Sequence, residues 1–222
     1  WYIIGAISVA CLPLSLWAAA RLSVPAQRNT AAGGIKLHLI WRELAGYVGF
    51  AMGYIVYLTF LSAWMTDQQA PALLISAVWI IMGLALIASP FVWRGVLARH
   101  ASGKPLAMIL TGIAVGSALP LVLPAGGAVV ISAVVFGLCV FMAPGAITSF
   151  IRQNLPAESW AAAMSLFTVV FAIAQTAGPF AAGALGDLTG NIGSSLLAAA
   201  AILLTGAAVV VFQKPLTAQD SA

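Results

Sequence analysis

The chain has 222 residues, of which 63% are hydrophobic and only 6% are charged, whereas about a quarter of the residues in soluble domains are charged. So little charge cannot cover a soluble globule of this size, and the bilayer must be the solvent. The nine Lys and Arg residues give a formal net charge of +4. They lie between apolar segments rather than on an element that could enter a nucleic-acid groove, so nucleic acid is excluded as the expected partner.

Seven apolar segments are long enough to cross roughly 30 Å of hydrocarbon as helices. In chain order they span about 1–20, 43–65, 72–93, 105–123, 128–149, 161–183 and 194–213. The segments are too long and too uniformly apolar to be the strands of a barrel. The sequence therefore predicts an all-α integral membrane protein with seven transmembrane helices.

Every Lys and Arg lies in the connections 21–42, 94–104 and 150–160 or in the tail from residue 214. The other connections contain Asp67 and Asp187 and no basic residue. Because short basic loops stay in the cytoplasm, the pattern places the C-terminus there and residue 1 on the opposite side. A start on that side without Met predicts that segment 1–20 is the last helix of a truncated N-terminal half.

The connection 21–42 is the longest one and has the composition of a linker, with Pro25 and Gly33–Gly34 between its charges. It separates the leading helix from six helices that are joined by short connections. We therefore expect 21–42 to be a cytoplasmic inter-domain linker, 43–213 to be one six-helix domain and 214–222 to be a cytoplasmic tail.

Catalysis is not expected from these residues, and no metal or cofactor is predicted. His38 and His100 have no Cys, His or carboxylate at ligand spacing, and the chain contains no zincin, nucleophile-elbow or Walker motif. Proton transfer inside a membrane requires ionisable groups at depth. All five acids are expected at helix ends, in loops or in the tail: Glu43, Asp67, Glu158, Asp187 and Asp220.

Segment 43–65 has the side chains best suited to contact an organic molecule. Its aromatic residues recur on one helical face, and Gly46, Gly49 and Gly53 beside them allow another backbone to approach closely. Tyrosine rings can stack on a substrate and hydrogen-bond it. We predict this role for Tyr54 and Tyr57, well inside the span, while ordinary helix packing is the alternative.

Segment 161–183 contains a polar stripe that includes Thr168 and Gln175. A buried glutamine is costly unless its amide has partners, so Gln175 should face a neighbouring helix or a wet cavity. Both possibilities stay open at this point, and Gln175 and Thr168 join the predicted substrate-binding set. The hydroxyl of Thr168 has a further alternative, a bond to the carbonyl one turn back.

Pairs of Gly and Pro interrupt two of the predicted spans, at Pro144–Gly145 and at Gly178–Pro179. Proline lacks an N–H and disturbs the preceding turn, so a helix can bend there. Such breaks are typical of bundles that change shape, although membrane helices also tolerate them. We predict gating or hinge roles for these four residues.

These motifs resemble the C-terminal half of a major facilitator superfamily transporter, entered during the sixth of twelve helices. Residues 94–104 read RGVLARHASGK and are similar to the family's Gly-x-Leu-Ala-Asp-Arg-x-Gly-Arg loop. Arg99 stands at the place of the Asp, and the spacing to Gly103 is one residue longer. Gly178–Pro179 followed by Gly183 and Gly186–Asp187 is similar to the family's eleventh helix. The stretch around Gly53–Tyr54 resembles the YbfB/YjiJ-type bacterial branch.

The resemblance implies a secondary transporter of a small organic solute in the bacterial inner membrane, working by alternating access. Its partners would be the solute, the bilayer and the missing N-terminal half of the same polypeptide, and Gly95 would belong to a gating loop. Proton coupling is expected in the missing half, so alanine at Asp67, Glu158 or Asp187 should not abolish it. The alternative is a seven-helix membrane scaffold or accessory subunit that transports nothing.

Overall fold

The computed structural model describes residues 2–21, 36–123 and 126–216. The chain divides into two compact units, Trp1–Ala32 and Gly33–Ala222. The first unit contains α1, Tyr2–Arg21. Most of the predicted linker, residues 22–35, lies outside the described residues.

The second unit is a helical bundle. Its helices are α2 (Leu37–Asp67), α3 (Ala72–Arg99), α4 (Lys104–Val122), α5 (Gly126–Val140), α6 (Met142–Asn154), α7 (Trp160–Thr189) and α8 (Ile192–Val210), with a 3-10 turn, η1 (Ala157–Ser159), before α7. Six apolar helical segments of this unit are long enough to span a membrane, with α5 and α6 together providing one of them, Gly127–Asn154. No strand occurs among the described residues. The chain is therefore an all-α, multi-pass membrane protein, as predicted.

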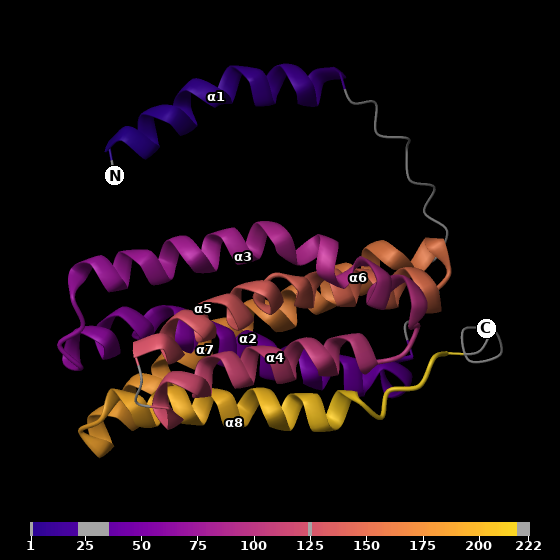
Figure 1. The fold of residues 1–222 in the computed structure, drawn as a ribbon. Coiled ribbons are helices and arrows are strands. Elements are labelled where there is room, and N and C mark those ends of the chain that lie inside the picture. Colours follow the sequence, from indigo (N-terminus) through magenta and orange to yellow (C-terminus); the bar gives the residue numbers. More distant parts are fainter. Residues whose placement is uncertain (1, 22–35, 124–125, 217–222) are drawn as a thin grey trace. The chain divides into compact units, whose positions relative to one another are not determined.

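The helices of the second unit run roughly side by side (Figure 1). Helix α2 packs between α7 and α8, α8 also packs on α4, and α5 packs between α4 and α3. The two outer members of this series, α3 and α7, are the least buried of the spanning helices. Their exposed faces carry large apolar side chains such as Leu84, Phe91 and Phe180.

Glycines set the distance between α2 and α8. A Cβ atom on Gly49 would meet the Cα of Gly206 at 3.2 Å, and one on Gly53 would meet the carbonyl oxygen of Ala199 at 3.0 Å. Side chains at these positions would force the two backbones apart. The glycine track predicted in segment 43–65 is therefore the surface on which α8 packs.

Four predicted boundaries differ from the structure by five or six residues, all at charged helix ends: besides the two described next, α6 continues to Asn154 and α7 to Thr189. Helix α2 begins at Leu37, so the last residues of the predicted linker are its first turns. Helix α3 continues to Arg99, so Gly95 lies in a helix and the connection to α4 is short. The predicted spans start or stop beside the basic residues Arg42 and Arg94. However, Lys and Arg side chains can extend toward water while their backbone stays helical.

The span predicted at 128–149 is divided at Phe141, where α5 ends and α6 begins. The backbone there has φ −90° and ψ 6°. The ring of Pro144 disturbs the turn that contains residue i−4, which is Val140. The interruption therefore falls about one turn before the Pro144–Gly145 pair, because proline acts on the turn that precedes it.

Candidate functional site

A hydrogen bond between two helices brings together residues that are 121 positions apart in the sequence. The Tyr54 hydroxyl on α2 donates to Oε1 of Gln175 on α7 over 2.6 Å. Tyr54 is 6% exposed and Gln175 is partly buried. The bond satisfies the hydroxyl of Tyr54 and the amide oxygen of Gln175. Two of the predicted substrate-binding residues thus form one pair.

Aromatic rings surround this pair. The ring of Phe50 stacks on Tyr54 with centroids 4.5 Å apart and an interplanar angle of 13°. Phe171, from α7, lies 6.0 Å from Tyr54 and 5.3 Å from Tyr47. Near-parallel rings at these separations gain dispersion and quadrupole energy beyond their area burial. The result is an aromatic wall, formed by Tyr47, Phe50, Tyr54 and Phe171, between α2 and α7.

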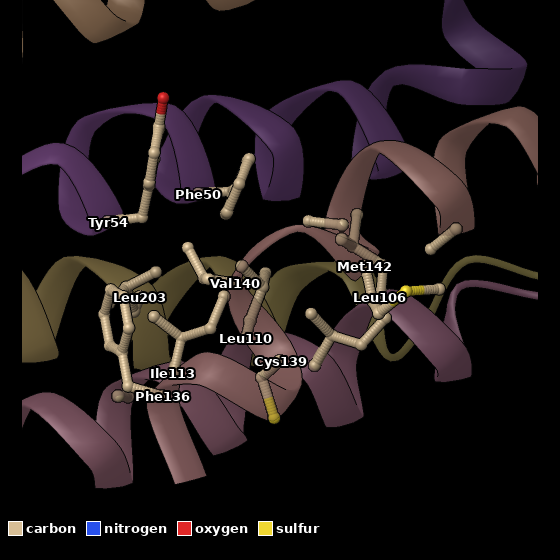
Figure 2. Close-up of a cluster of buried hydrophobic side chains, with 14 of the residues drawn as sticks. Phe50, Tyr54, Leu106, Leu110, Ile113, Phe136, Cys139, Val140, Met142 and Leu203 are labelled. Carbon is tan, nitrogen blue, oxygen red and sulfur yellow. The ribbon is translucent and has the colours of Figure 1, made fainter. Parts of the chain in front are cut away.

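Tyr54 projects away from the apolar centre of the bundle. Figure 2 shows its hydroxyl at the far end from the cluster that includes Ile113, Phe136 and Leu203. Phe50 lies beside it on the same helix. The pair therefore faces α7 rather than the core that α2 shares with α4 and α8.

The amide of Gln175 keeps hydrogen-bonding capacity. Its Oε1 accepts from Tyr54, and its Nε2 makes no hydrogen bond to any residue that the structure describes. A primary amide carries two N–H donors. Inside a membrane-spanning bundle these donors gain free energy from any acceptor that can reach them. The pair therefore offers amide N–H donors next to the aromatic wall, and none of these residues is charged.

Close approach of α7 to α2 makes the Tyr54–Gln175 bond possible. A Cβ atom on Gly178 would lie 2.6 Å from the carbonyl oxygen of Met52 and 3.1 Å from its Cα. Gly178 is one turn beyond Gln175, and Met52 is two residues before Tyr54. The close approach at Gly178 and the hydrogen bond therefore belong to the same helix crossing.

Tyr57 and Thr168, the other predicted substrate-binding residues, do not join the pair. Tyr57 has no exposed surface, and its hydroxyl lies 2.6 Å from Oγ of Ser132 on α5, which donates in turn to the Gly116 carbonyl. A solute could touch Tyr57 only if these helices separated. Thr168 is exposed, and its hydroxyl donates to the carbonyl of Met164 one turn back.

The predicted hinge residues have different surroundings. Pro144 and Gly145 lie in the first turns of α6, just after the interruption at Phe141. Gly178 and Pro179 lie inside α7, which is helical without a break. Gly95 is exposed on α3, with open space where a Cβ atom would stand. These positions are compatible with bending at α5–α6, while the hinge roles themselves stay predictions.

Glu43 is buried inside the bundle, although the sequence placed it with the other acids at helix ends, in loops or in the tail. It is 1% exposed on α2, and its Oε2 atom has no hydrogen-bond partner. Gly103, before α4, packs on this carboxyl and on the carbonyl of Val210. The α2 helix begins before Glu43, and the connection to α4 and the end of α8 cover it. Sequence reasoning missed this burial because it took Glu43 as the first residue of its helix.

Side-chain amides join the connections at the same end of the bundle. Gln213 donates to the carbonyl of Leu39 over 2.9 Å and accepts at its own carbonyl from the Gly103 N–H over 3.0 Å. Asn154 donates to Ala101 over 2.7 Å and accepts from the N–H of Leu216 over 2.7 Å. These bonds connect the starts of α2 and α4, the end of α6 and the segment after α8.

Sequence reasoning missed the partners rather than the main residues. Phe171 was not considered, although it lies four residues before Gln175 and therefore on the same face of α7. Ser132 was also missed, and its pairing with Tyr57 follows only from the packing of α5 on the bundle. A helical-face analysis of segment 161–183 for aromatic as well as polar residues could have found Phe171.

In a comparison with known protein families, residues 1–211 match the family described as uncharacterised MFS-type transporter YbfB. A comparison with individually curated proteins gives no match. The family match covers every helix that the structure describes, from α1 to α8.

Proposed function

The chain belongs to the YbfB-type family of major facilitator superfamily transporters, and from this premise we propose that it moves a small organic solute across a membrane by alternating access. The family is one of transporters rather than enzymes. The observation that carries the proposal is the Tyr54–Gln175 pair, which links two spanning helices next to an aromatic wall. We propose that the solute binds at this pair.

The chemistry of the pair favours a solute with a planar apolar part and at least one hydrogen-bond acceptor. The rings of the aromatic wall offer stacking, and Nε2 of Gln175 offers N–H donors. No charged residue forms part of the pair or the wall. An uncharged organic solute, or one whose charge is met elsewhere in the transporter, therefore fits best.

Alternating access requires that helices around the site change their mutual positions. We propose that the bundle bends at the interruption between α5 and α6, where the helix is already broken. We propose that this six-helix domain moves against an N-terminal half of the same polypeptide. We propose a bacterial inner membrane from the resemblance to the YbfB/YjiJ-type bacterial branch, and a cytoplasmic C-terminus from the distribution of basic residues.

A transport profile of the full-length protein tests the proposal. Cells that express the protein are compared with cells that lack it for uptake and export of a panel of uncharged aromatic and aliphatic solutes. Gln175→Ala removes the amide, and Thr176→Ala is the matched control, because its exposed hydroxyl bonds only to the Ala172 carbonyl. Both variants are checked for equal amounts in the membrane.

We expect at least one solute whose transport depends on the protein. Its transport should fall by about tenfold or more in Gln175→Ala, the effect of about 1.4 kcal/mol in transition-state free energy, and stay near wild type in Thr176→Ala. Equal transport by the two variants would contradict the proposed site. If cells with and without the protein transport every solute in the panel equally, the proposed solute class is wrong.

A further inference from the structure

A cavity opens at the end of the bundle opposite to Glu43 and Gln213. It has a volume of about 630 Å³ and lies where the α2–α3 turn, the end of α4 and the start of α8 meet. In Figure 1 these three parts lie together at one end of the bundle. Sites for small molecules in proteins occupy roughly 300–1,000 Å³. The cavity is large enough for an organic molecule.

The lining of the cavity is uncharged but not purely apolar. Apolar side chains line it from several helices: Met65, Leu74, Leu121, Val129 and Leu197. Three residues with amide side chains line it as well: Gln68, Gln69 and Asn191. None of its lining residues is Asp, Glu, Lys, Arg or His. Such a lining suits a molecule that has both an apolar part and uncharged polar groups.

Trp64 supplies a hydrogen-bond donor at this cavity that has no partner among the described residues. The indoles of Trp79, Trp93 and Trp160 donate to Ser62, Leu138 and Leu155, respectively. The partly buried Trp64 makes no such bond to a residue within the described ranges, and its Nε1 lies beside Gly193 at the cavity. Indole N–H groups that are partly buried usually have a partner. A bound molecule with an acceptor oxygen would provide it.

Gln69 holds a backbone conformation that favours glycine. Its φ is +56°, and no other non-glycine residue that the structure describes has a positive φ. It occupies the position after the end of α2 where the Gln69 N–H bonds to Thr66 and the Ala70 N–H bonds to Met65. Glycine is the common residue at this position of the motif. Gln69 holds this conformation at an energetic cost, and it is one of the residues that line the cavity.

We propose that this cavity binds an uncharged amphiphile, a molecule with a short apolar chain and a head rich in hydrogen-bond-accepting oxygens. The apolar lining takes the chain, and Trp64 and Gln69 donate to the head. Along α2, Trp64 lies ten residues beyond Tyr54, which is about 15 Å at the rise of a helix. The cavity is therefore separate from the Tyr54–Gln175 pair and does not depend on the function proposed there.

Binding of n-hexyl-β-D-glucoside tests the proposal. The full-length protein is reconstituted in nanodiscs of a single phosphatidylcholine, and its unfolding midpoint is recorded over a titration with this glucoside below its micelle concentration. Glucose lacks the apolar chain, and sodium hexyl sulfate carries the same chain with a charged head. Trp64→Phe removes the indole N–H at the cavity. Trp79→Phe is its matched control, because the Trp79 indole bonds to Ser62 instead.

We expect hexyl glucoside to raise the midpoint in a saturable way, and glucose and hexyl sulfate to leave it unchanged. The affinity should fall about 3- to 10-fold in Trp64→Phe, the loss of one hydrogen bond, and should be unchanged in Trp79→Phe. Gln69→Gly is expected to raise the unfolding midpoint of the ligand-free protein by about 2–4 °C, because glycine adopts a positive φ without strain. It should also weaken hexyl glucoside binding about 3- to 10-fold, as in Trp64→Phe.

Three results would overturn the proposal. The first is no saturable shift with hexyl glucoside in the wild-type protein. The second is equal affinity in the wild type and Gln69→Gly, a variant that is expected to fold better rather than worse. The third is binding of hexyl sulfate as tight as that of the glucoside, which would exclude an uncharged head as the requirement.

Discussion

A methyl group on Gly178 should separate the two helices that carry the candidate site. In Gly178→Ala the new Cβ atom would stand 2.6 Å from the carbonyl oxygen of Met52, about 0.8 Å short of the 3.4 Å at which ordinary contact begins. Because this neighbour is backbone, it cannot rotate away as a side chain could. Overpacking of this kind costs about 1–3 kcal/mol. We expect the free energy of unfolding to fall by that amount.

The same displacement should weaken the Tyr54–Gln175 bond. Moving α7 outward by about 0.8 Å at Gly178, one turn beyond Gln175, would lengthen the 2.6 Å bond toward 3.4 Å if it were transmitted in full. That distance is outside the normal range for O–H···O bonds. We therefore expect Gly178→Ala to reduce solute affinity as well as stability.

The assay compares Gly178→Ala with Gly183→Ala on the same helix. A Cβ atom on Gly183 would meet only the end of the Phe60 ring, at 4.0 Å. Alanine there should stabilise the helix by about 0.5–1 kcal/mol, because glycine is unfavourable within helices. Thermal unfolding of the purified proteins measures the difference. Equal or higher stability of Gly178→Ala relative to Gly183→Ala would refute the close helix crossing.

Three further substitutions test other parts of the bundle. Tyr57→Phe should lower the free energy of unfolding by about 1 kcal/mol, because the hydrogen bond between the Tyr57 hydroxyl and Ser132 is lost, and should leave solute affinity unchanged. A weaker affinity with unchanged stability would instead indicate solute contact. Glu43→Gln should raise the free energy of unfolding by about 1 kcal/mol, since an amide avoids the cost of burying an ionisable carboxyl group, and a lower unfolding midpoint would contradict this. Pro144→Ala should slow amide hydrogen exchange around Phe141, because it removes the ring that interrupts the helix. Unchanged exchange would show that another residue causes the interruption.

The helices were predictable because the bilayer imposes a simple rule on sequence. A span needs about 20 apolar residues and satisfies its own backbone hydrogen bonds, so each span is a local feature. The ends were less predictable. Arg94 and Arg99 suggested a loop, yet α3 continues to Arg99, because the basic side chains can reach water from a helix.

The candidate site was predictable only in part. Tyr54 and Gln175 were each identified from the chemistry of their own helix, but their pairing depends on how α7 packs on α2. The burial of Tyr57 and Glu43 likewise depends on neighbours that are distant in the sequence. One sequence contains the periodicity of each helix, whereas the choice of partner helix is a tertiary property.

A double-mutant cycle on the Tyr54–Gln175 pair tests the central claim most directly. Tyr54→Phe, Gln175→Ala and the double variant are compared with the wild type for the apparent affinity of a transported solute and for the unfolding midpoint. We predict that affinity falls in each single variant and that the two effects are non-additive by about 0.5–3 kcal/mol. Unchanged affinity in all three variants, with effects confined to stability, would show that the pair only joins two helices and that the solute binds elsewhere.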